Sequence, residues 1–327
     1  MSDQSIRELL RTKYRVEDGK KFLITDYNAD DTAGLSLSPK EAKKILKKRI
    51  KRLSYLQELL FANGHSALLV ALQGMDTSGK DGTIKHVTSG INPQGITITS
   101  FKQPGPVELM HDYLWRIHMA VPSRGKITIF NRSHYEEVLV TKVHPSILAN
   151  QKLPLRVLNN KNFWSDRYED IRNFEKYIYR QGIGIVKCFL NISKEEQRKR
   201  LLARLENKEK QWKFSPNDPK ERQFWEEYQG AYQEVIVQTA APNAPWFVIP
   251  ANNKWFARLV VAEIMIDELE KLHIPEPKPS QEVLESLNSL KAELGGKFSD
   301  NKVGKKIKKN NKIGKDKKIK NLNKSKE

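Results

Sequence analysis

The sequence predicts an α/β fold in which a five-stranded parallel β-sheet carries helices on both faces. Five short runs are almost wholly apolar, as expected for strands that are buried on both sides. Segments with apolar residues at helical spacing separate these runs, and such alternation is typical of parallel sheets. A glycine-rich stretch directly follows the first run, where a strand passes into a helix.

The N-terminal part ends in one long predicted helix. Residues 1–38 are mixed and polar, which predicts an irregular lead-in. Ser38 precedes Pro39 and a run of helix formers, so we expect Ser38 to cap a helix that has Pro39 in its first position. Apolar residues continue at helical spacing as far as Asn63, and Gly64 then marks the end.

Strands and helices alternate through the rest of the chain. The strands are predicted at residues 67–73, 96–101, 126–131, 184–192 and 245–250. Helices are predicted at residues 83–91, 108–121, 164–181, 194–212, 224–239 and 255–272. The chain therefore divides into the lead-in at 1–38, one α/β domain at 39–273, a Pro-rich linker with a short helix at 274–296, and a Lys-rich tail at 297–327. We expect the tail to be disordered, because it has too few apolar groups to offset the entropy of ordering.

Composition restricts the class of protein. The 327 residues, 38% of them hydrophobic, are enough for one substantial core or two small domains. No stretch approaches the roughly 20 apolar residues of a membrane span, and the N-terminus has no apolar signal core. The single Cys188 excludes an internal disulfide, so we expect a cytoplasmic protein with no membrane partner.

The net charge is strongly positive and is divided between the body of the chain, residues 1–296, and the tail, residues 297–327. The formal net charge is +19, of which the 13 lysines and three acidic residues of 297–327 account for +10. The other 296 residues carry +9, so the body is basic without its tail. A basic body favours an anionic partner, such as nucleic acid, a membrane surface or a polyphosphorylated substrate. The alternative is a generally basic soluble enzyme, and the tail could also bind polyanions.

The glycine-rich stretch GMDTSGKDGT has the Gly-x4-Gly-Lys pattern of a phosphate-binding loop between a strand and a helix. Its backbone N–H groups can surround a phosphate while the lysine neutralises phosphate oxygens. Asp81 stands where such loops usually have Ser or Thr for Mg²⁺, so Asp76 is the better metal ligand. The alternative is a glycine-rich turn with incidental charge. The predicted phosphate-binding residues here are Gly74, Thr77, Ser78, Gly79, Lys80, Asp81, Gly82 and Thr83.

A second polar cluster follows the third predicted strand. Asn131 and Arg132 stand at its end, with Glu136 one turn further on. In open α/β sheets ligands bind beyond the carboxyl ends of the strands, so this cluster lies where a ligand is expected. Arg132 could clamp a phosphoryl group through its planar guanidinium, and Asn131 is a neutral substitute for the usual metal-binding Asp. The alternative is a loop that only caps the next helix.

Six stretches, in this order, resemble the polyphosphate kinase 2 family: GMDTSGKDGTIKH, INPQG, TSFKQP, HDYLWR, IFNRSHYEEVLVTKVHP and APWFVIPANNKWFARL. The resemblance runs from about residue 20 to 273 and is greatest for the subgroup that phosphorylates both AMP and ADP. It implies a thymidylate-kinase-like P-loop kinase fold, with a five-stranded parallel sheet in three layers and a helical lid. It also implies reversible transfer of a phosphoryl group from inorganic polyphosphate to AMP or ADP, with Mg²⁺ as cofactor. Guanine nucleotides and Mn²⁺ are the alternatives.

The resemblance also implies roles for individual residues. Asp76 would organise Mg²⁺, Lys80 would contact the phosphates, and Asn131 and Arg132 would form a Walker B-like pair with Glu136 nearby. These assignments make Asp76, Lys80, Arg132 and Glu136 the predicted catalytic residues, and Asp76 and Asn131 the predicted metal ligands. Other members of the family carry Asp at the position of Asn131, so this residue need not supply charge to the metal.

Further basic residues are expected around the phosphates. Polyphosphate carries about one negative charge per phosphate, and phosphoryl transfer needs mainly positioning and charge compensation. The helix at 194–212 carries Arg200 and Arg204 on one face, which predicts a lid at about 193–216 that closes over the phosphates. The alternative for this helix is a solvated basic face. The predicted rim of the phosphate groove comprises Lys85, Lys102, Arg116, Arg132 and Lys142.

Three functions remain open from these residues. The first is a polyphosphate-dependent nucleotide kinase, the second a nucleoside monophosphate kinase that uses ATP, and the third a basic nucleic-acid-binding protein. His86, His111, His118 and His134 match no zinc motif and are expected to be structural. A homo-oligomer is expected, because symmetric assembly is common among soluble enzymes.

Overall fold

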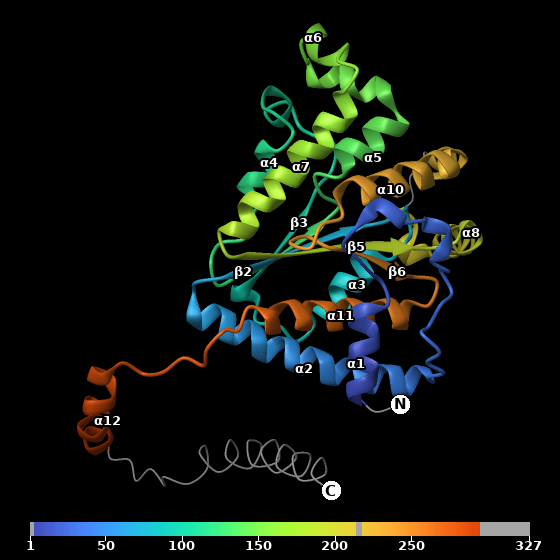
Figure 1. Cartoon of the computed structure of the whole chain (residues 1–327). Helices are drawn as coiled ribbons and strands as arrows, with labels where there is room; N and C mark the ends of the chain where they lie inside the picture. Colours follow the sequence, from blue (N-terminus) through green and yellow to red (C-terminus); the bar gives the residue numbers. More distant parts are fainter. Residues whose placement is uncertain (1–2, 214–217, 295–327) are drawn as a thin grey trace, which may run out of the picture. The chain divides into compact units, whose positions relative to one another are not determined.

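A six-stranded β-sheet lies at the centre of the computed structural model, which describes residues 3–213 and 218–294 (Figure 1). The chain forms two units, Met1–Glu276 and Pro277–Glu327, and the first contains the whole sheet. The strand order is β1-β6-β5-β2-β4-β3, with β1 antiparallel to β6 and the other five parallel. The strands are β1 (Arg15–Val16), β2 (Ala67–Gln73), β3 (Ile96–Ser100), β4 (Ile127–Asn131), β5 (Ile183–Asn191) and β6 (Trp246–Pro250).

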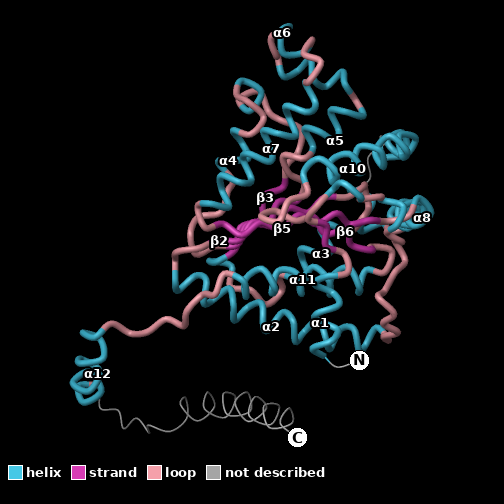
Figure 2. Tube along the Cα trace, viewed as in Figure 1, coloured by secondary structure: helices cyan, strands magenta, loops and turns pink. Residues whose placement is uncertain are grey.

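Helices cover both faces of this sheet (Figure 2). Helices α1 (Asp3–Thr12), α2 (Pro39–Asn63), α3 (Lys80–Val87) and α11 (Lys254–Lys271) lie on one face. Helices α4 (Trp115–Met119), α5 (Glu136–Val143), α7 (Phe163–Arg180) and α10 (Trp225–Thr239) lie on the other. The other α-helices of the described residues are α6 (Leu155–Leu158), α8 (Lys194–Glu206), α9 (Asp218–Glu221) and, in the second unit, α12 (Gln281–Glu293). The predicted parallel sheet in three layers is therefore confirmed.

Helix α2 begins as its sequence predicts. The Ser38 side chain accepts a hydrogen bond from Glu41 N, and Ser38 N donates to the Glu41 carboxylate over 2.9 Å. This reciprocal pair satisfies donors that a helix start leaves without partners. At the other end Gly64 has a φ of 68°, the left-handed conformation in which glycine ends helices at little cost.

Two predicted elements differ from the structure. Residues 1–38 are not merely irregular, because they supply α1 and the short edge strand β1. Ile6, Leu10, Tyr14 and Val16 are buried there, a pattern too sparse to stand out in a polar segment. The predicted helix at 108–121 is interrupted, since the Asp112 side chain accepts from Leu114 N over 2.9 Å and forms a local turn. Only a 3₁₀ turn at Glu108–Met110 and α4 remain helical.

The strand order determines where the functional residues meet. Strand β2 lies between β4 and β5, and Leu72 of β2 is opposite Asn131 of β4. The loop after β2, the turn after β4 and the start of α8 after β5 therefore share one edge of the sheet. Among residues 3–213 and 218–294, no helix has the length and apolar character needed to cross a membrane.

Candidate active site

The glycine-rich loop after β2 wraps closely around its own lysine. Lys80 Nζ donates to Gly74 O over 2.6 Å and to Met75 O over 3.3 Å, and the side chain is buried. A Cβ atom on Gly74 would lie 2.7 Å from Ser78 Oγ and 2.9 Å from Leu190 O, so only glycine fits without a shift. The hydroxyls of Thr77 and Ser78 are buried without a hydrogen-bond partner. These polar groups leave the loop ready to receive an external acceptor such as a phosphate.

Burial also changes the acidity of Lys80. Loss of solvent, together with the nearby Arg132 cation, lowers the pKa of Lys80 to about 8. The carboxylates of Asp76, Glu136 and Asp81 oppose this shift but do not cancel it. A bound phosphate would favour the protonated ammonium and raise the pKa again.

Arg132 connects the loop to the turn after β4. Its guanidinium donates to Asp76 Oδ1 over 2.7 Å and to Glu136 Oε2 over 2.9 Å. The Glu136 carboxylate, assisted by Asp76, raises the pKa of Arg132 further above its ordinary value, so the cation is permanent. Arg132 has a φ of 64°, a left-handed conformation that costs a non-glycine residue roughly 1–2 kcal/mol. Such strain persists where the surrounding structure holds it, often at functional sites.

Asn131 forms a second link between the same two segments. Its amide nitrogen donates to Asp81 Oδ1 over 2.8 Å and lies 3.5 Å from Ser100 Oγ. An asparagine can make this bond directly, whereas an aspartate would need a cation or a proton between two carboxylates. The amide carbonyl of Asn131 is then the group that can meet a metal ion.

These residues line a cleft of about 690 Å³ at the carboxyl ends of the strands. Most of the predicted phosphate-binding residues are in it, together with the predicted metal ligand Asp76: Thr77, Ser78, Gly79, Lys80, Asp81, Gly82, Lys102, Asn131, Arg132, Arg200 and Arg204. Gly74 and Glu136 line a small adjoining cavity that shares Asp76 and Arg132 with the cleft. Thr83 is buried in α3, and Lys85 is exposed on that helix away from the cleft.

Two other predicted basic residues also lie elsewhere. Lys142 is ion-paired with Glu234 and lies over the ring of Trp164. Arg116 is buried, where it donates to Lys102 O over 2.8 Å and lies 3.5 Å from the Glu137 carboxylate. Neither lines this cleft, and each has a carboxylate partner within the fold, although Arg116 borders two neighbouring cavities.

The cleft also contains residues that sequence reasoning missed. Lys199 neighbours Arg200 on α8, and Lys254 begins α11 just after β6. Lys254 could have been found, because it follows the carboxyl end of a predicted strand, where ligands bind in such sheets. Lys199 had no such signal, since its neighbours in α8 are mostly charged as well.

Helix α8 is held against the loop by Arg200. Its guanidinium contacts Thr77 O at 3.0 Å, Ser78 O at 2.9 Å, and Asn252 O at 2.9 Å. Its Nε donates to Glu196 over 2.7 Å, and its side chain is 8% exposed. Arg200 was predicted to bind phosphate, but its donors are used to join the loop to α8 and to the residues after β6. Of the predicted lid, residues 214–216 lie outside the described part of the chain.

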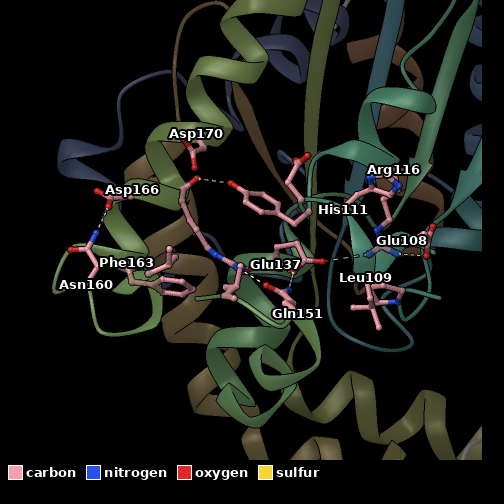
Figure 3. Close-up of a pocket in the computed structure, with 16 residues that line it drawn as sticks. Glu108, Leu109, His111, Arg116, Glu137, Gln151, Asn160, Phe163, Asp166 and Asp170 are labelled. Carbon is pink, nitrogen blue, oxygen red and sulfur yellow. Dashed lines mark hydrogen bonds and ion pairs between the residues drawn. The ribbon is translucent and has the colours of Figure 1, made fainter. Parts of the chain in front are cut away.

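Two further cavities continue from the phosphate cleft. One, of about 440 Å³, shares Phe101, Lys102 and Arg132 with the cleft. Its other lining residues combine apolar side chains such as Leu109 and Ile147 with charged ones such as Arg116 and Glu137. The next, of about 230 Å³, is shown in Figure 3. In it Arg116 lies between Glu108 and Glu137, Gln151 meets Glu137, and Asn160 faces Asp166.

The cleft offers oxygen donors to a divalent cation. Asp76, Asp81 and Asn131 all line it, and Asn131 is bonded to Asp81. Magnesium is commonly held by one or two carboxylates together with substrate phosphates, so this donor set fits it. Within residues 3–213 and 218–294, no three His, Cys, Asp or Glu side chains are grouped so as to hold a metal by themselves. His134 is buried next to Glu175, and His86 Nδ1 contacts Gly82 O at 2.7 Å.

Comparison with known proteins identifies the family. Residues 36–277 match the family model described as polyphosphate kinase 2. The chain belongs to the polyphosphate kinase 2 family. An "ADP-polyphosphate phosphotransferase" of Rhodopseudomonas palustris is 47% identical over 239 residues, which are 72% of this chain and 83% of the relative. An "AMP/ADP-polyphosphate phosphotransferase" of Meiothermus ruber is 44% identical over 267 residues, 82% of this chain and 96% of the relative.

A solved structure of a member of this family is similar to the chain in fold and in sequence. The crystal structure of polyphosphate kinase 2 from Arthrobacter aurescens TC1 has a TM-score of 0.78 and 38% sequence identity to this chain. The similarity covers 86% of this chain and 96% of the other. The P-loop kinase fold expected from the motifs is thus confirmed.

Proposed function

We propose that this protein transfers a phosphoryl group from inorganic polyphosphate to an adenine nucleotide, AMP or ADP. The observation that carries this proposal is the charge of the cleft after β2 and β4. Seven Lys or Arg side chains and three acidic side chains line it, around a phosphate-binding loop. Family membership and the names of the relatives support the same reaction.

The lining residues supply the positioning and charge compensation that phosphoryl transfer requires. The loop amides and Lys80 would bind the phosphates at the point of transfer, with Lys80 leaving the loop carbonyls for phosphate oxygens. Arg132, held between Asp76 and Glu136, lines the cleft and would add its positive charge at the same point. Lys102, Lys199 and Lys254 would compensate the phosphates further along the chain.

We infer that the metal is Mg²⁺, held by Asp76 and Asn131. When bound, it would neutralise negative charge on the phosphate groups. Arg132 already contacts Asp76 Oδ1, so the carboxylate is oriented before any cation arrives. The cavity that shares Arg132 and Phe101 with the cleft is suited to the acceptor nucleoside, because it combines apolar side chains such as Leu109 and Ile147 with polar and charged ones.

The test measures phosphoryl transfer from polyphosphate to ADP and from polyphosphate to AMP. The protein is mixed with Mg²⁺, long-chain polyphosphate and ADP or AMP, and the product nucleotides are separated by anion-exchange chromatography. We expect polyphosphate-dependent formation of ATP from ADP and of ADP from AMP, abolished by EDTA and restored by Mg²⁺. No transfer from polyphosphate, with good transfer from ATP to AMP, would instead select an ordinary nucleoside monophosphate kinase. Lys80→Ala should abolish transfer, whereas Lys176→Ala, at an exposed position of α7, should not.

A further inference from the structure

A fully buried ion pair lies directly behind the turn that carries Arg132. Lys187, in the middle of β5, and Glu175, on α7, have side chains that are 0% and 2% exposed. Lys187 Nζ donates to Glu175 Oε2 over 2.8 Å, to Thr239 O over 2.7 Å and to Tyr135 Oη over 3.0 Å. All three ammonium donors are therefore used, so the lysine is satisfied although it is fully buried.

The second oxygen of Glu175 holds the segment that follows Arg132. Tyr135 Oη donates to Glu175 Oε1 over 2.7 Å, and His134 Nε2 lies 3.4 Å from the same oxygen. Burial opposes ionisation, but Lys187 and then His134 keep the pKa of Glu175 below its ordinary value. The carboxylate therefore stays charged and accepts from both side chains.

The same segment is also tied to the start of the phosphate-binding loop. Gln73, the last residue of β2, donates to Ser133 Oγ over 3.0 Å, and Tyr135 N donates to Ser133 Oγ over 3.3 Å. The buried pair thus holds His134 and Tyr135, and Gln73 holds Ser133, so all three residues that follow Arg132 are fixed. Arg132 itself has the strained φ of 64° and reaches back to Asp76.

A buried ion pair is a poor way to gain stability. Replacing such a pair with apolar residues of similar size is often neutral or stabilising, because the charges lose their hydration on burial. An explanation by stability alone is therefore weak, while the position behind Arg132 suggests a role in geometry. A misplacement of about 1 Å at a reacting centre can cost about a hundredfold in rate.

We propose that Lys187 and Glu175 are positioning residues for phosphoryl transfer, which act through Tyr135 and His134 to hold Arg132 against Asp76. The inference rests on the function proposed above. Neither residue lines the cleft, so neither touches a substrate. Their effect should therefore appear in kcat, with little change in KM.

The test replaces Lys187 and Glu175 with apolar residues and compares the effect with that of replacing a second buried ion pair. We expect Lys187→Met/Glu175→Leu to keep or raise Tm and to lower kcat at least about tenfold at nearly unchanged KM. The control is Arg49→Met/Glu263→Leu, a second buried ion pair, with side chains 6% and 0% exposed, that joins α2 to α11 within a network with Arg7, Arg11 and Asp3. Neither residue lines the cleft or the small cavity beside Arg132. We expect the control to keep its kcat whatever happens to its Tm.

A mutant cycle that includes Arg132 decides whether the loss of kcat is transmitted through that residue. In an Arg132→Ala background, the Lys187/Glu175 replacement should cause almost no further loss of kcat, because coupled residues are not additive. Full additivity, or a folded double variant with wild-type kcat, would overturn the proposal. If the double variant does not fold, Tyr135→Phe decides, because it removes only the hydroxyl that links the pair to the turn. A lower kcat at constant KM supports the proposal, and a wild-type kcat refutes it. Wild-type enzyme in the same assay shows separately whether polyphosphate transfer occurs at all.

Discussion

Lys80 should give polyphosphate binding a characteristic dependence on pH. Its pKa of about 8 in the free protein means that the ammonium needed for phosphate is lost in mildly alkaline solution. Phosphate monoesters have lost their second proton well below this range, near about pH 6, so the ligand does not change charge there. A decline in binding above pH 8 would therefore report the lysine.

The size of the effect follows from the fraction of protein that is protonated. Apparent affinity falls in proportion to the binding-competent fraction, so it should drop about twofold at pH 8 and about tenfold at pH 9. Because this pKa belongs to the free enzyme, the decline should appear in kcat/KM, and kcat should stay nearly level. The complex keeps its lysine protonated, since bound phosphate raises the pKa.

The titration of Lys80 does not itself destabilise the fold over this pH range. The pKa of Lys80 in the folded protein lies below the ordinary value of 10.5, so the unfolded chain binds more protons between about pH 8 and 10.5. The contribution of Lys80 to the free energy of unfolding therefore increases with pH over this range. Deprotonation of Lys80 should therefore lower kcat/KM while its contribution to the free energy of unfolding rises.

The assay measures initial rates of ATP formation from ADP and polyphosphate between pH 7 and 9.5. Lys80→Arg is the matched variant, because a guanidinium keeps its charge throughout this range. We expect the variant to be less active, since its planar fork does not fit the loop, but to show no decline in kcat/KM from this titration. A flat wild-type profile up to pH 9.5, or the same slope in Lys80→Arg, would refute the argument.

Three other outcomes follow from the site. Asp76→Asn should lower kcat by at least about a hundredfold, which is the scale of losing one preorganised electrostatic partner. Near-wild-type turnover of this variant in steady-state assays would show that Asp76 is not a catalytic residue. Arg132→Gly and Arg132→Ala should both lose activity, but the glycine variant should be the more stable by about 1 kcal/mol, because glycine accepts the φ of 64°. Urea denaturation measures this difference, and equal unfolding midpoints for the two variants would count against backbone strain at this position. Deleting residues 297–327 should leave kcat largely intact, because the cleft is built from residues 76–254, and a collapse of turnover would place the tail in the site. Any polyanion affinity that the tail adds should weaken steeply with salt in a binding titration.

The features that could be predicted from the sequence are those that contiguous residues encode. Ser38 and Glu41 cap α2 from positions three residues apart, and the loop from Gly74 to Lys80 lies between a wholly buried strand and a helix. The placement of Asn131 beside that loop also followed, because parallel strands bring their carboxyl ends to one edge of the sheet. In each case a short pattern carries its own geometry.

The partners of charged side chains were decided only by the tertiary structure. Arg132 meets Asp76 from 56 positions away, and Arg200 uses its donors on loop carbonyls more than 120 positions away. Lys187 looks in the sequence like an interruption of an apolar strand, yet it is fully buried against Glu175. Whether a cation faces a substrate, a carbonyl or a buried carboxylate depends on which strands are neighbours. The one-dimensional pattern specifies the charge of a residue, whereas its burial and its nearest acceptor come from the packed sheet.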